Sequence, residues 1–200
     1  MAQQTEQNNK QAKNYKHIYE AAYKAMNNSV LDIDCGTLCS HNCCRNDYEN
    51  PEEFGVYLLP FEYEHFLKNT GMMKPSQMDW HAAKDRFMPK SLKGLNYFYC
   101  NVEKDCLRQY RPVQCRTYPL EPHLENGKLS LVVEKDQIHE CPLIQRREQW
   151  RADYVKGMYE GWSLLIQIPE VRKLVQYDSD CRKREGNVLY KIIDTADVCK

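Results

Sequence analysis

Apolar side chains repeat at helical spacing near the start of the chain, at Tyr15, Ile18, Tyr19, Ala22, Tyr23 and Met26. The pattern predicts a helix over about 15–27, with this stripe packed on a core. The preceding residues are rich in Gln, Asn and Lys, so we expect residues 1–14 to form a disordered N-terminal tail.

The next third of the chain alternates between short apolar runs and polar segments. A β-prone run predicts a strand over 54–59, and Pro60 suits the first turn of a helix over 60–69. A mixed segment with proline and polar residues predicts loop structure with one short helix near 77–87. A run of tyrosine and phenylalanine then predicts a strand over 95–100.

The pattern of the last third is the clearest. Asn126-Gly127 lies between apolar runs at 120–124 and 129–134, which is the strongest short-range signal for a β-hairpin. Helical spacing over 144–167 predicts the longest helix of the chain. Pro169 is expected to open a further short helix that ends near Tyr177.

These elements predict a helix-rich α+β single domain with a few short strands and a β-hairpin around a cysteine-rich metal centre. Its 200 residues suit one domain, which we place at 15–177. A C-terminal extension, 178–200, contains the apolar run Val188–Ile193 and is expected to pack on that domain.

Charge and targeting signals narrow the class of protein. The 28 basic residues balance 28 acidic ones, so we expect no nucleic-acid partner. The N-terminus lacks the apolar core of a signal peptide, and no stretch is apolar enough to span a membrane. We therefore expect a cytoplasmic protein with no membrane partner.

Ten cysteines change this picture, because a reducing compartment makes a disulfide framework unfavourable and points to metal or redox chemistry. Eight of them fall in short segments that each bring one or more sulfurs, as thiolate metal sites require. The predicted metal ligands are Cys35, Cys39, Cys43, Cys44, Cys100, Cys106, Cys115 and Cys141. Cys181 and Cys199 stand apart, and we expect them to be ordinary thiols.

The spacing leaves the metal and the partition of sulfurs open. Zinc and iron–sulfur sites use similar gaps, and eight sulfurs suffice for two four-ligand sites or for one site with thiols left over. The gaps between Cys35, Cys39 and Cys43 suit one helical face, yet the intervening residues favour a loop. The adjacent Cys43 and Cys44 diverge in either geometry and are not expected to serve one site equivalently.

Cationic side chains beside the cysteines are candidates to support a thiolate cofactor. Four thiolates on a divalent ion leave a charge of about −2, which neighbouring cations offset. Arg111 and Arg116 flank Cys115 and are predicted to bind the cofactor in this way, and Arg45 follows Cys44. His41, His123 and His139 could replace a cysteine, but eight thiols make none of them necessary.

The order of motifs resembles the YkgJ-type cysteine-cluster family. The residues that carry the likeness are the Cys35-to-Cys44 cluster, Cys100 and Cys106, the Arg-Pro-x-x-Cys-Arg-x-Tyr-Pro block at 111–119, and Cys141-Pro142. The family is described as zinc- or iron-chelating and is related to a domain of flagellin lysine N-methylases. The resemblance implies that the eight cysteines are metal ligands. This chain departs from the family pattern in the first loop, where three residues separate Cys35 from Cys39 and Ser40-His41 follows Cys39.

Three functional hypotheses follow. The first is a metal-binding protein that holds an iron–sulfur cluster, zinc, or both, with a protein partner or substrate left open. The second is an enzyme, either a protein-lysine N-methylase-like protein or a redox catalyst, although no Gly-x-Gly loop for a nucleotide-type cofactor is present. The third is an interaction module in which metal only stabilises the fold.

Overall fold

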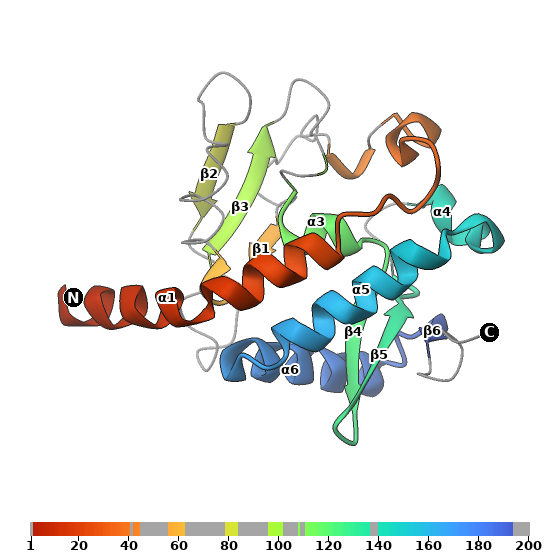
Figure 1. Cartoon of the computed structure of the whole chain (residues 1–200). Coiled ribbons are helices and arrows are strands. Elements are labelled where there is room, and N and C mark those ends of the chain that lie inside the picture. Colours follow the sequence, from red (N-terminus) through yellow and green to blue (C-terminus); the bar gives the residue numbers. More distant parts are fainter. Residues whose placement is uncertain are drawn as a thin grey trace. The chain divides into compact units, whose positions relative to one another are not determined.

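The computed structural model describes residues 2–40, 42–44, 56–62, 79–83, 96–101, 108, 111–136 and 140–193. The chain separates into two compact units. The first unit contains residues 1–20 and 44–116, and the second contains residues 21–43 and 117–200. Both consist of helices and short antiparallel strands (Figure 1), which confirms the mixed helix-and-strand class.

Helix α1 (Ala2–Ala25) is longer than predicted, because it begins inside the segment that we expected to be disordered. Gln, Lys, Glu and Ala are good helix formers, and their propensity here outweighs the polar composition of the segment. The predicted apolar face is confirmed in both units. Tyr19 is buried in the first, where its hydroxyl donates to Pro60 O at 2.5 Å, and Ala22 and Met26 are buried in the second.

The first unit contains an antiparallel sheet with the order β1 (Val56–Leu58), β3 (Asn96–Asn101), β2 (Asp79–Ala83). Strands β1 and β3 confirm two predicted strands. Strand β2 corrects the short helix predicted near 77–87: its five residues pair with β3, from Asp79 opposite Asn101 to Ala83 opposite Tyr97. Strand pairing outweighs the helical propensity of its two alanines. Most of the helix predicted over 60–69 lies outside the described residues.

A buried carboxylate joins two segments of the first unit. Glu62 is fully buried, and its two oxygens accept hydrogen bonds from the backbone N–H groups of Leu59 at 2.8 Å and Val113 at 2.7 Å. Val113 begins helix α3 (Val113–Thr117), where the N–H groups have no partner within the helix. Glu62 therefore fixes the start of the helix that carries Cys115.

The second unit is built on the predicted hairpin. Strands β4 (Glu121–Glu125) and β5 (Lys128–Val133) pair with Glu125 opposite Lys128, and Asn126 and Gly127 turn the chain with φ of 50° and 77°. Both residues tolerate positive φ, as a two-residue hairpin turn requires. The apolar run of the C-terminal extension adds a third antiparallel strand, β6 (Tyr190–Ile193), to β5.

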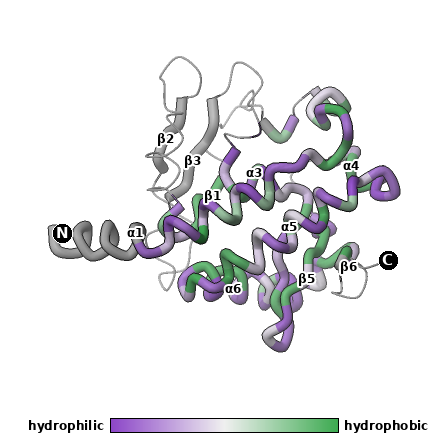
Figure 2. Tube along the Cα trace, in the orientation of Figure 1, coloured by the Kyte–Doolittle hydropathy of each residue, from purple (hydrophilic) through white to green (hydrophobic). Residues whose placement is uncertain are grey.

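The long helix predicted over 144–167 is wrong. The chain instead forms α4 (Pro142–Gln145), a 3-10 turn (Arg147–Gln149) and α5 (Ala152–Leu165). Helix α6 (Pro169–Glu185) extends past its predicted end and stops at Gly186, which has a φ of 64°. Figure 2 shows hydrophobic and hydrophilic residues alternating along α5 and α6. Their buried side chains, together with those of β4 and β5, form the core of this unit. None of the helices in the described part of the chain has an apolar stretch long enough to cross a membrane.

Helix α6 is fixed to strand β4 through polar contacts. The Ser179 hydroxyl accepts from Leu124 N–H at 2.9 Å, and the buried Arg182 guanidinium donates to Pro122 O at 2.8 Å. Arg182 also pairs with Glu134 and lies 3.8 Å from a carboxylate oxygen of Glu121. Two carboxylates therefore face one guanidinium.

This arrangement predicts a pH dependence of stability. Burial, together with the Glu134 carboxylate, raises the pKa of Glu121 to about 8, although Arg182 opposes the shift. Because the folded chain holds this proton more tightly than the unfolded chain, Glu121 lowers the free energy of unfolding as the pH rises from about 4.5 to about 8. We expect Glu121→Gln to abolish that decline, which is on the order of 3–5 kcal/mol. Urea unfolding from pH 5 to 9 measures it.

The exposed Glu160 provides the matched control, because its side chain is 53% exposed and Glu160→Gln should run parallel to wild type. Asp178 also has a raised pKa, of about 6, and both variants retain it. A Glu121→Gln curve parallel to wild type across this range would contradict the prediction.

Candidate metal centre

A short 3-10 turn presents the first two cysteines of the cluster. The turn spans Cys35–Leu38, and the Asp34 carboxylate caps it by accepting from Gly36 N–H at 3.1 Å. Cys39 follows and donates its N–H to Gly36 O at 3.3 Å. Both thiols are half-buried. Asp34 was not among the predicted site residues, although an acidic residue before a tight turn is a recognisable capping signal.

The second pair of cysteines lies on another 3-10 turn, Asn42–Cys44. Between the turns, Ser40 has a φ of 52°, which breaks any continuous helix through the cluster. The question left open by the sequence is thus answered in favour of the loop. Cys43 is exposed, and the boundary between the two units falls between Cys43 and Cys44.

Cys141 comes close to this loop from a distant part of the chain. It precedes α4, with Pro142 at the first helical position, and it is only 7% exposed. Its thiol lies near enough to Cys35 and Cys39 for their thiolate charges to act on it. Tyr118 lies in the same region, since charges on Cys39, Cys43 and Cys141 all act on its hydroxyl. The second unit thus brings Cys39, Cys43 and Cys141 around Tyr118, and Cys35 lies within electrostatic range of Cys141.

Trp150 and Arg151, which lie where the predicted long helix is interrupted, hold the cysteine loop and the segment of Cys141 in place. Arg151 N–H donates to Val30 O at 3.0 Å, and the Arg151 guanidinium pairs with Asp32, so the cysteine loop is fixed at its start. The indole N–H of Trp150 donates to Leu143 O at 2.9 Å, beside Cys141.

Tyr154 completes this set of contacts at the start of α5. Its hydroxyl donates to Thr117 O at 2.9 Å, next to Tyr118, and its ring stacks edge-on against Trp150 at 6.2 Å. Three residues within one short segment therefore anchor the cysteine loop, Cys141 and Tyr118.

Burial and neighbouring charge decide the protonation of this group. Burial raises the pKa of the Cys141 thiol to about 11, and the thiolates of Cys39 and Cys35 add to the shift. The N–H groups of Leu143 and Ile144 oppose it. Burial also raises the pKa of Tyr118, with further contributions from Cys141, Cys43, Glu121 and Cys39. Cys141 and Tyr118 are therefore neutral at pH 7 when no cation is bound.

The donor set suits a thiophilic metal, but its arrangement is not that of a closed site. Among the described residues, no three His, Cys, Asp or Glu side chains are grouped as metal ligands would be. Sulfur ligands select zinc, copper(I) or iron–sulfur clusters over magnesium or calcium. The thiols of the second unit therefore have suitable chemistry and are gathered, but they are not positioned as ligands of one ion.

Cys115 and the predicted cofactor-binding arginines lie in the first unit. Cys115 is half-buried on α3. Arg116, which is 2% exposed, donates from Nε to Arg111 O at 2.6 Å and accepts at its own carbonyl from Arg108 Nη2 at 3.0 Å. These hydrogen bonds give Arg116 a role in holding the turn that precedes α3. Cofactor binding by Arg111 and Arg116 stays a prediction.

Other predicted residues fall wholly or partly outside the description. Cys100 lies on β3 opposite Trp80, and Cys44 ends the second turn, but their side chains are not among those described. Cys106, His41, His139, Arg45 and Cys199 lie outside the described residues. Cys181 lies on α6, where Arg184 donates to its sulfur at 3.4 Å.

Comparison with known proteins adds no relative: no protein family, curated protein or solved structure matches the chain. The resemblance to the YkgJ-type family therefore stays a prediction based on the motifs alone. The assignment of the site must rest on the residues and their surroundings.

Proposed function

We propose that this chain is a cytoplasmic metal-binding protein whose eight clustered cysteines hold zinc, an iron–sulfur cluster, or both. We further propose that the sulfurs divide into two sets of four, one in each compact unit. Cys35, Cys39, Cys43 and Cys141 form the set in the second unit, and Cys44, Cys100, Cys106 and Cys115 form the set in the first. Each set matches the four sulfurs of a closed thiolate site.

The approach of Cys141 to Cys35 and Cys39 is the observation that carries this proposal. A buried thiol is unremarkable alone, because free cysteine packs as a small hydrophobe. Two further thiols around Tyr118, Cys39 and Cys43, on a loop fixed by Arg151, are not required for packing. Such a group favours a role for the sulfurs themselves.

The chemistry of the proposed site follows from its surroundings. A bound cation removes the mutual repulsion of the thiolates, so each thiol loses its proton as the metal binds. Amide N–H groups of Leu143 and Ile144 lie where they favour the Cys141 thiolate. Tyr118 keeps its hydroxyl proton at neutral pH and can donate a hydrogen bond to a coordinated sulfur. A zinc site would stabilise the fold, and an iron–sulfur cluster would supply electron transfer.

Metal analysis of anaerobically purified protein tests the proposal. We expect at least about two equivalents of iron plus zinc per chain, because each of the two four-sulfur sets holds a metal site. A brown protein whose visible absorption bleaches with dithionite would identify iron–sulfur, and a colourless protein with stoichiometric zinc would identify a structural site. Less than about half an equivalent of both metals together would overturn the proposal.

A further inference from the structure

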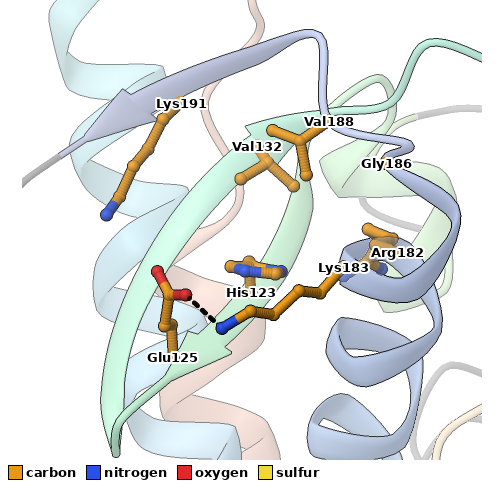
Figure 3. Close-up of a pocket in the computed structure, with 8 residues that line it drawn as sticks. All are labelled: His123, Glu125, Val132, Arg182, Lys183, Gly186, Val188 and Lys191. Atoms are coloured by element: carbon orange, nitrogen blue, oxygen red, sulfur yellow. Dashed lines mark hydrogen bonds and ion pairs between the residues drawn. The ribbon is translucent and has the colours of Figure 1, made fainter.

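A second feature of the second unit is unrelated to the cysteines. A cavity of about 330 Å³ opens between the three-stranded sheet and the C-terminal end of α6 (Figure 3). His123 and Glu125 reach it from β4, Lys191 from β6, and Arg182 and Lys183 from α6. Its volume lies at the lower end of the range for small-molecule sites.

The charges that line this cavity are mainly positive. Three cations, Arg182, Lys183 and Lys191, face one carboxylate, Glu125. Lys183 pairs with Glu125 at 2.9 Å, whereas Lys191 has no ion pair among the described residues. Because an ammonium group carries three donors, Lys183 can keep Glu125 and still reach a ligand. Lys191 and the remaining N–H donors of Lys183 are therefore available to bind an anionic ligand.

Arg182 supplies a fixed charge at the base of the cavity. Its guanidinium is buried and held by Pro122 O and the Glu134 carboxylate. The neighbouring Glu121 has a pKa raised to about 8, so it is mostly neutral at pH 7 and compensates this charge little. Because the Glu134 carboxylate offsets the Arg182 charge, Lys183 and Lys191 supply the positive charge that a ligand can reach.

His123 is the least satisfied group of the cavity. Its residue is only 7% exposed, and its Nδ1 is buried without a hydrogen-bond partner among the described residues. Burial lowers the pKa of His123, and the cations Arg182, Lys191 and Lys183 lower it further, while Glu125 opposes them. Nδ1 itself is buried beyond the reach of a ligand, but His123 lines the cavity, and an anion bound there would offset the charge of these cations and favour the protonated ring.

We propose that this cavity binds a phosphate monoester of a small molecule, with Lys183, Lys191 and His123 facing the phosphate. Three donors from three elements match the several acceptor oxygens of a phosphate better than the two of a carboxylate. The volume exceeds that of a bare anion, and Val132 and Val188 give the cavity an apolar side for an organic group. This inference does not depend on the metal-binding proposal.

Calorimetric titration of the full chain with phenyl phosphate, inorganic phosphate and phenol tests the inference. We expect phenyl phosphate to bind at least about fivefold more tightly than inorganic phosphate, and phenol not to bind. Lys191→Met should weaken phenyl phosphate binding at least about tenfold, as should Lys183→Met. Lys173→Met, an exposed change on α6 away from the cavity, should stay within about twofold of wild type.

The His123 imidazole gives a second readout by NMR. Its pKa should rise when phenyl phosphate is added, because a bound anion favours the protonated ring. Equal binding by the Lys191→Met and Lys173→Met variants would overturn the inference. Equal affinity for inorganic phosphate and phenyl phosphate would overturn it too, as would an unchanged His123 pKa at saturating ligand.

Discussion

Cys141→Ser is expected to abolish metal binding in the second unit, which removes roughly half of the metal bound by the chain if each unit holds one site. Serine keeps the size of the side chain but replaces a soft sulfur ligand with a hydroxyl that zinc and iron–sulfur clusters rarely use. Since Cys141 belongs to a segment distant in sequence from Cys35 and Cys39, its loss also removes the metal-mediated link between these segments. Metal per chain and the midpoint of thermal unfolding measure both effects.

Cys181→Ser is the matched control for this experiment. Cys181 is a half-buried cysteine of the same unit, but it lies on α6 beside Arg184 and outside the clustered motifs. We expect it to leave metal content and unfolding unchanged. Cys115→Ser should remove the other half of the metal, from the first unit. Equal metal loss in Cys141→Ser and Cys181→Ser would show that the assignment of the sulfurs is wrong.

Gly157→Ala is expected to destabilise the second unit strongly. A Cβ at this position would lie 2.3 Å from the carbonyl oxygen of Ala25 and 3.3 Å from its carbonyl carbon. Both atoms belong to the backbone at the end of α1, so a side-chain rotation cannot relieve the clash. We expect a loss of at least about 1–3 kcal/mol in the free energy of unfolding, measured with urea.

Gly186→Ala is the comparison, because Gly186 ends α6 with a φ of 64° and has open space around its position. Its cost should be the backbone strain alone, about 1 kcal/mol. In an unpacked helix, alanine would instead stabilise relative to glycine by up to about 1 kcal/mol. A Gly157→Ala variant as stable as wild type would therefore contradict the close contact between α5 and α1.

Local signals in the sequence were sufficient for the elements that depend on local chemistry. The Asn126-Gly127 turn, the strands on either side of it and the apolar face of α1 follow from turn chemistry and periodicity. Strand β2 and the break before α5 were predicted wrongly, because both depend on distant partners. Strand β2 pairs with β3, and the break frees Trp150 and Arg151 to contact Leu143 and Val30.

The predictions for the candidate site also divide into those that follow from local sequence and those that depend on distant parts of the chain. Clustering of cysteines predicts a ligand set, but spacing could not show that Ser40 breaks the helical path. It also could not show that Cys141 lies within electrostatic range of Cys35 and Cys39, because that placement depends on the anchoring of several loops. The basic cavity was missed for a similar reason: its cations lie on α6 and β6 and come together only in the folded sheet.

X-ray absorption at the edge of the bound metal tests the central claim most directly, because it identifies the ligand atoms. For zinc or iron in anaerobically purified protein, the account predicts a first shell of about four sulfurs at roughly 2.3 Å, with Tyr118 contributing no oxygen ligand. Cys141→Ser protein should contain less metal but show the same shell, from the intact site of the first unit. A first shell of only nitrogen or oxygen at about 2.0–2.1 Å would contradict the account.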